Sequence, residues 1–229
     1  MNSFFLHKVN YHAREELFPV HMHVPSTLEE LMEIEAACAA LGMHRACGSM
    51  NVVHMPLGAC PHGLMSICTG KEGHPTLGHN VICDHTGRAL ALIPGVHGTM
   101  NDKTIVKSDE AVEKVKNEKI FTEHQCQVFR ADRTSYFTKG TCLIVDGGYL
   151  RWKCLQCALK MISDDDCVLW RIKMESVRKD IECYFGRLKQ LCRMLRIPNL
   201  LKDEGKIDNM IFAIITINNM AHDCVVAAE

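Results

Sequence analysis

A short apolar run that ends in an aspartate and two glycines restricts the fold of this chain more than any other feature. Residues 142–145 read Cys-Leu-Ile-Val and are followed by Asp146, Gly147 and Gly148. A run of this length and composition is typical of a buried strand, and the two glycines allow the backbone to turn sharply after it. The pattern therefore predicts a strand that carries an acid at its C-terminal end.

A second acid, Glu182, lies in a segment with helical periodicity, and 35 residues separate it from Asp146. We expect a long helix from about residue 168 to residue 195, which Pro198 ends. Carboxylates from a strand end and from a following helix can converge on divalent cations, so both acids are candidate metal ligands. Two plainer alternatives are that Asp146 only shapes a turn and that Glu182 only pairs with Arg178 one turn earlier.

The order of the predicted elements indicates an α/β domain. A helix begins at a capping box over residues 26–29 and ends near Gly42. After it we expect strands over 48–55, 79–83 and 89–93, a helix of about 15 residues from 101, the strand ending at Asp146, the long helix, and a last helix from about 208. Three antiparallel meander strands, a helix crossover to a fourth strand and flanking helices are typical of an RNase H-like core with a mixed sheet.

The same pattern divides the chain into three parts. Residues 1–41 are expected to form an N-terminal arm and a helix, with residues 1–25 extended. Residues 42–223 are expected to form the α/β domain, with loops over 57–76 and 117–139. Residues 224–229 are left as a C-terminal tail.

Composition excludes several classes of protein. The chain has 229 residues, of which 47% are hydrophobic, so a full core is expected, and its net charge of −1 does not by itself indicate nucleic-acid binding. Residues 1–12 lack an apolar stretch of signal-peptide length, and no apolar segment is long enough to span a membrane. We therefore expect a nuclear or cytoplasmic protein, neither secreted nor membrane-bound, whose 13 cysteines are reduced thiols.

Four motifs in order resemble the DDE endonuclease domain of Harbinger-type transposases and their domesticated relatives. They occupy residues 83–88, 98–106, 143–149 and 175–189, and the resemblance spans about residues 42–223. It implies an RNase H-like core, a DNA phosphodiester substrate, a divalent metal (Mg²⁺ or Mn²⁺) as cofactor, and a nuclear location. By the same match, Asp146 and Glu182 are the second and third acids of a catalytic triad.

The first acid of that triad is replaced in this chain. The family motif Gly-Ser-x-Asp-x-x-His corresponds to residues 48–54, which read Gly-Ser-Met-Asn-Val-Val-His, so Asn51 stands at the acid position. Its amide oxygen can still bind a cation, but the site loses one formal charge where two ions must be neutralised. We expect weak metal binding and impaired catalysis. The alternative is an inactive domain that acts in DNA or protein binding.

Two further departures concern the ends of the resemblance. The last helix of the family carries Leu-His-Asn, whereas residues 217–219 read Ile-Asn-Asn. A complete transposase of this kind resembles a two-part protein with an N-terminal helical DNA-binding region, and residues 1–41 are too few to form it. A separate DNA-binding partner protein is therefore expected to supply that function.

Basic residues near these motifs are candidate DNA contacts. Lys71 lies in a glycine-containing loop, and Arg178 and Lys189 lie on the predicted long helix. A flexible charged loop and a solvated helix face explain the same residues equally well. Two aspartates nearby have simpler roles, since Asp102 is expected to cap a helix and Asp84 to shape a hairpin turn.

Cysteine spacing provides a third, weaker hypothesis, a zinc-stabilised module. Cys154 and Cys157 have the spacing of half a zinc site, but a second half with matching spacing is missing. Cys60, His62 and Cys68 add loose candidates only. The three aspartates at 164–166 are expected to form a solvated loop rather than a metal site.

Overall fold

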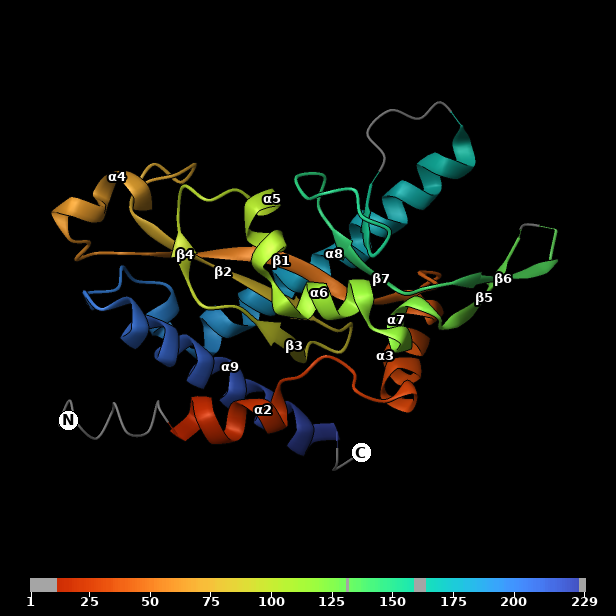
Figure 1. The fold of residues 1–229 in the computed structure, drawn as a ribbon, viewed down its shortest axis with the longest axis horizontal. Coiled ribbons are helices and arrows are strands. Elements are labelled where there is room, and N and C mark those ends of the chain that lie inside the picture. Colours follow the sequence, from red (N-terminus) through yellow and green to blue (C-terminus); the bar gives the residue numbers. More distant parts are fainter. Residues whose placement is uncertain (1–11, 131, 159–163, 227–229) are drawn as a thin grey trace.

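A mixed sheet forms the centre of the computed structural model, which describes residues 12–130, 132–158 and 164–226 (Figure 1). The strand order is β3-β2-β1-β7-β8, and a short strand, β4, also pairs with β2. These strands are β1 (Ala46–Pro56), β2 (Thr76–Cys83), β3 (Ala89–Leu92), β4 (Val96–His97), β7 (Cys142–Val145) and β8 (Leu155–Cys157). The predicted α/β class with a mixed sheet is therefore confirmed.

The strand directions follow the chain order. β1, β2 and β3 are neighbours and antiparallel, as the predicted meander requires. β7 pairs with the other side of β1 in parallel, with Ser49 opposite Ile144, and β8 then pairs in parallel with β7. All four residues of β7 are buried, which confirms the prediction drawn from its continuous apolar run.

Helices cover both faces of the sheet (Figure 1). On one face, Leu31 of α3 (Leu28–Ala40) and Val112 of α6 (Glu110–Asn117) share a core with Met50 and Leu143. On the other face, α8 (Asp165–Leu191) and α9 (Glu204–Val226) pack against β2 and β3 in a second core. Alternate residues of β1 enter the two cores because successive side chains of a strand point to opposite faces.

The helix predicted from residue 101 is divided into three pieces. They are α5 (Asp102–Ile105), a 3₁₀ turn at Val106–Ser108, and α6. The break occurs because Asp109 caps α6, its carboxylate accepting hydrogen bonds from the backbone N–H groups of Ala111 and Val112. α7 (Lys119–Thr122) and a separate hairpin, β5 (Gln125–Phe129) and β6 (Ser135–Lys139), replace the loop expected after it.

The described part of the predicted extended arm is helical instead. A π-helical turn (Ala13–Leu17) and α2 (Phe18–His21) lie along α9, with the rings of Phe18 and Phe212 4.7 Å apart. Burial of Phe18 against α9 explains the helical course, and the sequence period of so short a segment could not indicate it. Residues 1–11 and 227–229 lie outside the described residues.

The N-terminus of α3 is capped one residue later than predicted. Thr27 and Glu30 form the capping box, and Gly42, with φ of +77°, follows the helix end as expected. The loop between β1 and β2 contains a 3₁₀ turn (His62–Leu64) and α4 (Met65–Cys68), and another 3₁₀ turn (Arg193–Leu195) follows α8. Among the helices in the described ranges, none is long and apolar enough to cross a membrane.

Asn219 fastens α9 to its surroundings. Its buried side chain accepts a hydrogen bond from the backbone N–H of Ala89 and donates to the carbonyl oxygens of Ala89 and His21. It is the one residue of the Ile-Asn-Asn sequence that matches the Leu-His-Asn pattern. These three bonds join α9 to β3 and to the end of α2.

Candidate metal site at the edge of the sheet

Asp146 follows β7 directly and is half-buried at the C-terminal edge of the sheet. Its carboxylate accepts a hydrogen bond from the backbone N–H of Gly148. A Cβ atom at Gly148 would lie 2.9 Å from an oxygen of Asp146 and 2.9 Å from an oxygen of Asp102. The two carboxylates therefore border the same small space beside Gly148, and a larger residue at position 148 would displace one of them.

Asp102 was not predicted to belong to this site. Asn101 caps α5 by accepting a hydrogen bond from the backbone N–H of Thr104, so the capping role expected of Asp102 is wrong. Asp102 is instead the first residue of the helix, and its carboxylate approaches that of Asp146. The sequence held a signal for this, because asparagine caps helices as well as aspartate does.

Asn51 lies on β1, next to the strand that carries Asp146. Because Ser49 is opposite Ile144 in the parallel pairing, continuing two residues along both strands places Asn51 level with Asp146. Val53 packs against the core of α8 and α9, and alternation directs the Asn51 side chain to the same face. The Asn51 side-chain oxygen accepts a hydrogen bond from the backbone N–H of Val52 at 2.9 Å.

Glu182 lies on an exposed flank of α8 and is bound by arginine. Arg178 donates to Glu182 at 2.8 Å and to Glu175 at 2.9 Å, so the ion pair considered as the plainer alternative is present. On the opposite flank of the helix, Asp180 contacts His85 and Arg187 donates to the carbonyl oxygen of Gly87. Those contacts hold one flank at the β2–β3 turn and leave the flank of Glu182 facing away from that turn.

The pKa values of His54 and Tyr149 are shifted by burial and by the charges around them. Burial lowers the pKa of His54 from its usual value, Lys71 lowers it further, and Asp102 acts in the opposite direction. Burial also raises the pKa of Tyr149, and the carboxylates of Asp102 and Asp146 add to this increase. Asp102 thus acts on both His54 and Tyr149, and Asp146 acts on Tyr149.

The predicted site residues are brought together only in part. Asp146 converges with Asp102, and Asn51 lies level with Asp146, while Glu182 is held by Arg178. Within the described ranges, two groups of three His, Cys, Asp or Glu side chains have ligand atoms within 4.8 Å of one another, and neither includes Asp146 or Glu182. The acids at the sheet edge therefore form an open arrangement.

Other predicted residues have roles that the structure makes clear. Asp84 shapes the β2–β3 turn, as expected, by accepting hydrogen bonds from Thr86, Gly87 and Arg88. The loop expected at 164–166 is wrong: Asp164 caps α8, and the next two aspartates form its first turn, where the helix dipole favours negative charge.

The three predicted DNA contacts have different surroundings. Lys71 is exposed in the loop between β1 and β2, and Arg178 is occupied by Glu175 and Glu182. Lys189 is half-buried beside the apolar residues at the C-terminal end of α8.

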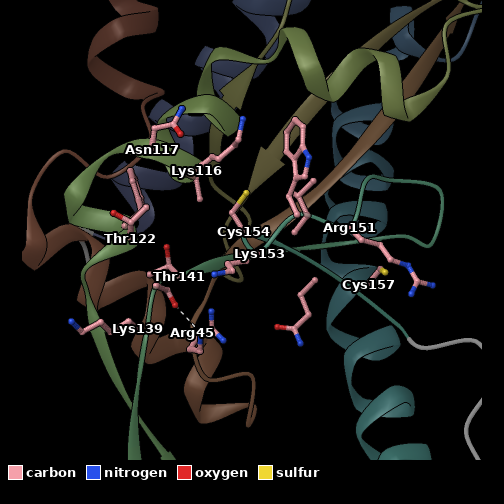
Figure 2. Close-up of a pocket in the computed structure, with 16 residues that line it drawn as sticks. Arg45, Lys116, Asn117, Thr122, Lys139, Thr141, Arg151, Lys153, Cys154 and Cys157 are labelled. Carbon is pink, nitrogen blue, oxygen red and sulfur yellow. Dashed lines mark hydrogen bonds between the residues drawn. The ribbon is translucent and has the colours of Figure 1, made fainter.

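A basic cleft at the β8 edge was missed by the sequence analysis (Figure 2). It has a volume of about 1130 Å³, and its lining includes five cationic side chains and no acidic one: Arg45, Lys116, Lys139, Arg151 and Lys153. These residues come from α6, β6 and two connecting segments, so no run of basic residues marks them in the sequence. Cys154 and Cys157 also line the cleft as free thiols, and neither belongs to a ligand cluster in the described part of the chain.

These features define an α/β protein with carboxylates gathered where its central parallel strand ends, the place where α/β sheets commonly bind ligands. Residues 21–225 match the family described as plant transposon protein, and the chain belongs to that family. The comparisons found no match among proteins with curated descriptions and none among solved structures.

Proposed function

We propose that this chain is a DDE-type endonuclease domain of the Harbinger kind, with an RNase H-like core and a weakened divalent-cation site. The strand order, with three antiparallel strands followed by a parallel fourth strand after a helical crossover, supports this assignment. Membership of a transposon-derived family supports DNA as the substrate class.

The observation that carries the proposal is the convergence of Asp146 and Asp102 at Gly148. Two carboxylates at such short range repel each other, and a cation between them removes that cost. Their oxygens are the donors that Mg²⁺ and Mn²⁺ take in proteins, and both side chains are half-buried rather than sealed from solvent. The residues present therefore fit a divalent cation.

Each residue of the site has a distinct role in this proposal. Asp146 and Asp102 hold the cation, and Asp102 supplies the negative charge that position 51 has lost. Asn51 offers a neutral oxygen, provided that it releases the N–H of Val52. Glu182 completes the set by exchanging its partner Arg178 for the cation. When bound, Mg²⁺ or Mn²⁺ supplies activation of the attacking water or hydroxyl and stabilisation of the leaving oxygen of a phosphodiester.

The basic cleft supplies a path for DNA in the same account. Its lining residues 151–157 follow the loop that begins at Asp146, so the cleft and the acids are connected by a few residues of chain. Lys116 is paired with Glu113, which lies outside the lining, and the other four cations have no acid among the lining residues. Cationic side chains bind phosphates in any sequence, which positions a duplex without reading its bases.

A second candidate function is DNA or protein binding without catalysis. Two contacts favour it. The Asn51 oxygen and the Glu182 carboxylate would be the third and fourth ligands of the cation, but they already accept hydrogen bonds from the N–H of Val52 and from Arg178. A domain with these contacts fixed would keep the fold and the cleft and lose the cation.

Cleavage of supercoiled DNA in Mg²⁺ or Mn²⁺ tests the proposal and separates the two candidates. We expect the wild-type chain to nick DNA weakly and Asp146→Ala not to nick it at all. Asn51→Asp should raise the rate about tenfold or more, because this requires the restored carboxylate to stabilise the transition state by only about 1.4 kcal/mol.

The control is Asp132→Asn, in the exposed turn of the β5–β6 hairpin, which should leave the rate unchanged. If Asn51→Asp does nothing while Asn51→Ala cleaves like the wild type, position 51 is not a ligand. If no variant cleaves, including Asn51→Asp, the second candidate function holds.

A further inference from the structure

A separate group of metal-ligating side chains lies where the β1–β2 loop meets β4 and the start of α9. The thiol of Cys68, a ring nitrogen of His97 and a carboxylate oxygen of Glu204 all lie within 4.8 Å of one another. Cys68 ends α4, His97 ends β4, and Glu204 begins α9. Three segments distant in sequence therefore present their ligand atoms to one point.

A fourth ligand is available beside these three. The thiol of Cys60 lies in the same loop and adds to the effect of burial in raising the pKa of Cys68 to about 11, so the two thiols are near each other. Cys68 is fully buried, whereas Cys60, His97 and Glu204 are half-buried, so the group borders solvent and a cation can reach it.

We propose that Cys60, Cys68, His97 and Glu204 form a structural zinc site. Two thiolates, an imidazole and a carboxylate are all ligands that zinc takes, and four protein ligands close a tetrahedral structural site. Thiolates select against Mg²⁺ and Ca²⁺, which require oxygen donors. Three of the ligand atoms, those of Cys68, His97 and Glu204, are already grouped, and His97 is 3.3 Å from the Glu204 carboxylate. Cys60 joins them by giving up its contact with the carbonyl oxygen of Pro61, which is 3.6 Å long.

The second ligand cluster in the described ranges differs from the cluster at Cys68 in its hydrogen bonds. Glu35, His124 and Cys126 also lie within 4.8 Å of one another, but the two oxygens of Glu35 are each hydrogen-bonded at 2.6 Å, one to His124 and one to Cys126. That cluster is satisfied as a hydrogen-bond network, with both oxygens of its carboxylate in use. The group at Cys68 has the second thiol, Cys60.

A zinc ion here would fasten the β1–β2 loop to the body of the domain. The loop already contacts the chain after α8, since the backbone N–H of Gly58 donates to the carbonyl oxygen of Asn199 at 2.7 Å. The same loop carries Lys71, which influences His54 near the acids. The site is independent of the proposed nuclease function, and zinc there has a structural role only.

Metal analysis of the full chain, purified without added metal, tests the site. We expect about one zinc ion per chain, as one closed site requires, with most of it lost in Cys68→Ser and in His97→Ala. The matched control is the double variant Cys154→Ser and Cys157→Ser, which removes the other cysteine pair and should keep its zinc. Replacement of zinc by Co²⁺ should give a thiolate-to-cobalt absorption band that Cys60→Ser weakens.

Three results would overturn the proposal. The first is a folded wild-type chain, judged by circular dichroism, that contains no zinc and gives no cobalt–thiolate band. The second is full zinc content in Cys68→Ser. The third is zinc loss in the Cys154 and Cys157 control, which would move the site to the basic cleft. If Cys68→Ser does not fold, the half-buried Cys60→Ser and the cobalt band decide the question.

Discussion

In the proposed site, Asn51 and Asp102 share a role that one aspartate fills in the DDE domains that the sequence resembles. Asn51 holds the position of the acid but is neutral, and its oxygen is bound to its own neighbour, Val52. Asp102 comes from a different segment. An oxygen of its carboxylate and one of the Asp146 carboxylate would each lie 2.9 Å from a Cβ atom at Gly148. At the scale of single residues, the charge of the site is thus preserved better than its sequence motif suggests.

Arg178 is the residue that most directly opposes a cation at this site. It holds Glu182 in an ion pair while its own side chain is mostly buried, 17% exposed. We predict that Arg178→Gln raises the affinity for Mn²⁺ by up to about fivefold, because a partly exposed pair of this kind contributes no more than about 1 kcal/mol. Calorimetric titration with Mn²⁺ measures the change.

Lys179→Gln is the matched control for Arg178, since Lys179 is exposed on the same turn of α8. It removes one positive charge from the helix without touching Glu182, and its Mn²⁺ affinity should equal that of the wild type. A fall in affinity for Arg178→Gln would mean that the arginine positions Glu182 for the cation rather than competing with it.

The cleft at the β8 edge is a property of elements rather than of a motif. α6, β6 and the segment before β8 each contribute one or more cations to it. We predict that the double variant Arg151→Gln and Lys153→Gln weakens binding to a DNA duplex by about tenfold at low salt. The plot of the logarithm of the binding constant against the logarithm of salt concentration should also become less steep, by about 0.9 in slope for each phosphate that the variant no longer neutralises.

Fluorescence anisotropy with a labelled duplex at several salt concentrations measures both quantities. The control removes two charges elsewhere, with Lys173→Gln and Lys179→Gln on the exposed face of α8. Equal weakening in the control would show that DNA responds to total charge and not to the cleft.

Elements with strong local signals could be predicted from the sequence, and those fixed by distant contacts could not. β7 was predicted because four consecutive apolar residues precede two glycines, and the β2–β3 hairpin because Asp84 and the residues after it form a turn. β8 has only three residues at the sheet edge, too few to show a period. The helical course of residues 13–21 depends on packing against α9, which no local pattern encodes.

The same distinction holds for the sites. Asp146 was proposed because it ends a continuous apolar run before two glycines, and Glu182 because its segment has a clear helical period. Asp102 was missed because two adjacent residues, Asn101 and Asp102, are both good helix caps, and only the fold shows which one is used. The cationic cleft and the cluster at Cys68 draw their residues from segments that meet only after folding.

The whole molecule separates its three sites around one sheet. The acids lie at the C-terminal end of β7, the cleft lies at the β8 edge, and the ligand cluster at Cys68 lies near β4 on the opposite side of the strand order. If all three proposals hold, a change at the acids leaves the proposed DNA surface and the proposed zinc site in place.

Diffraction from crystals soaked in Mn²⁺, recorded for its anomalous signal, tests the central claim most directly. We predict a peak within coordination reach of both Asp146 and Asp102, about 2.0–2.6 Å from their oxygens, and a stronger peak in Asn51→Asp. A well-ordered site without any peak in Asn51→Asp, or manganese bound only elsewhere on the chain, would contradict the claim that this sheet edge holds a divalent cation.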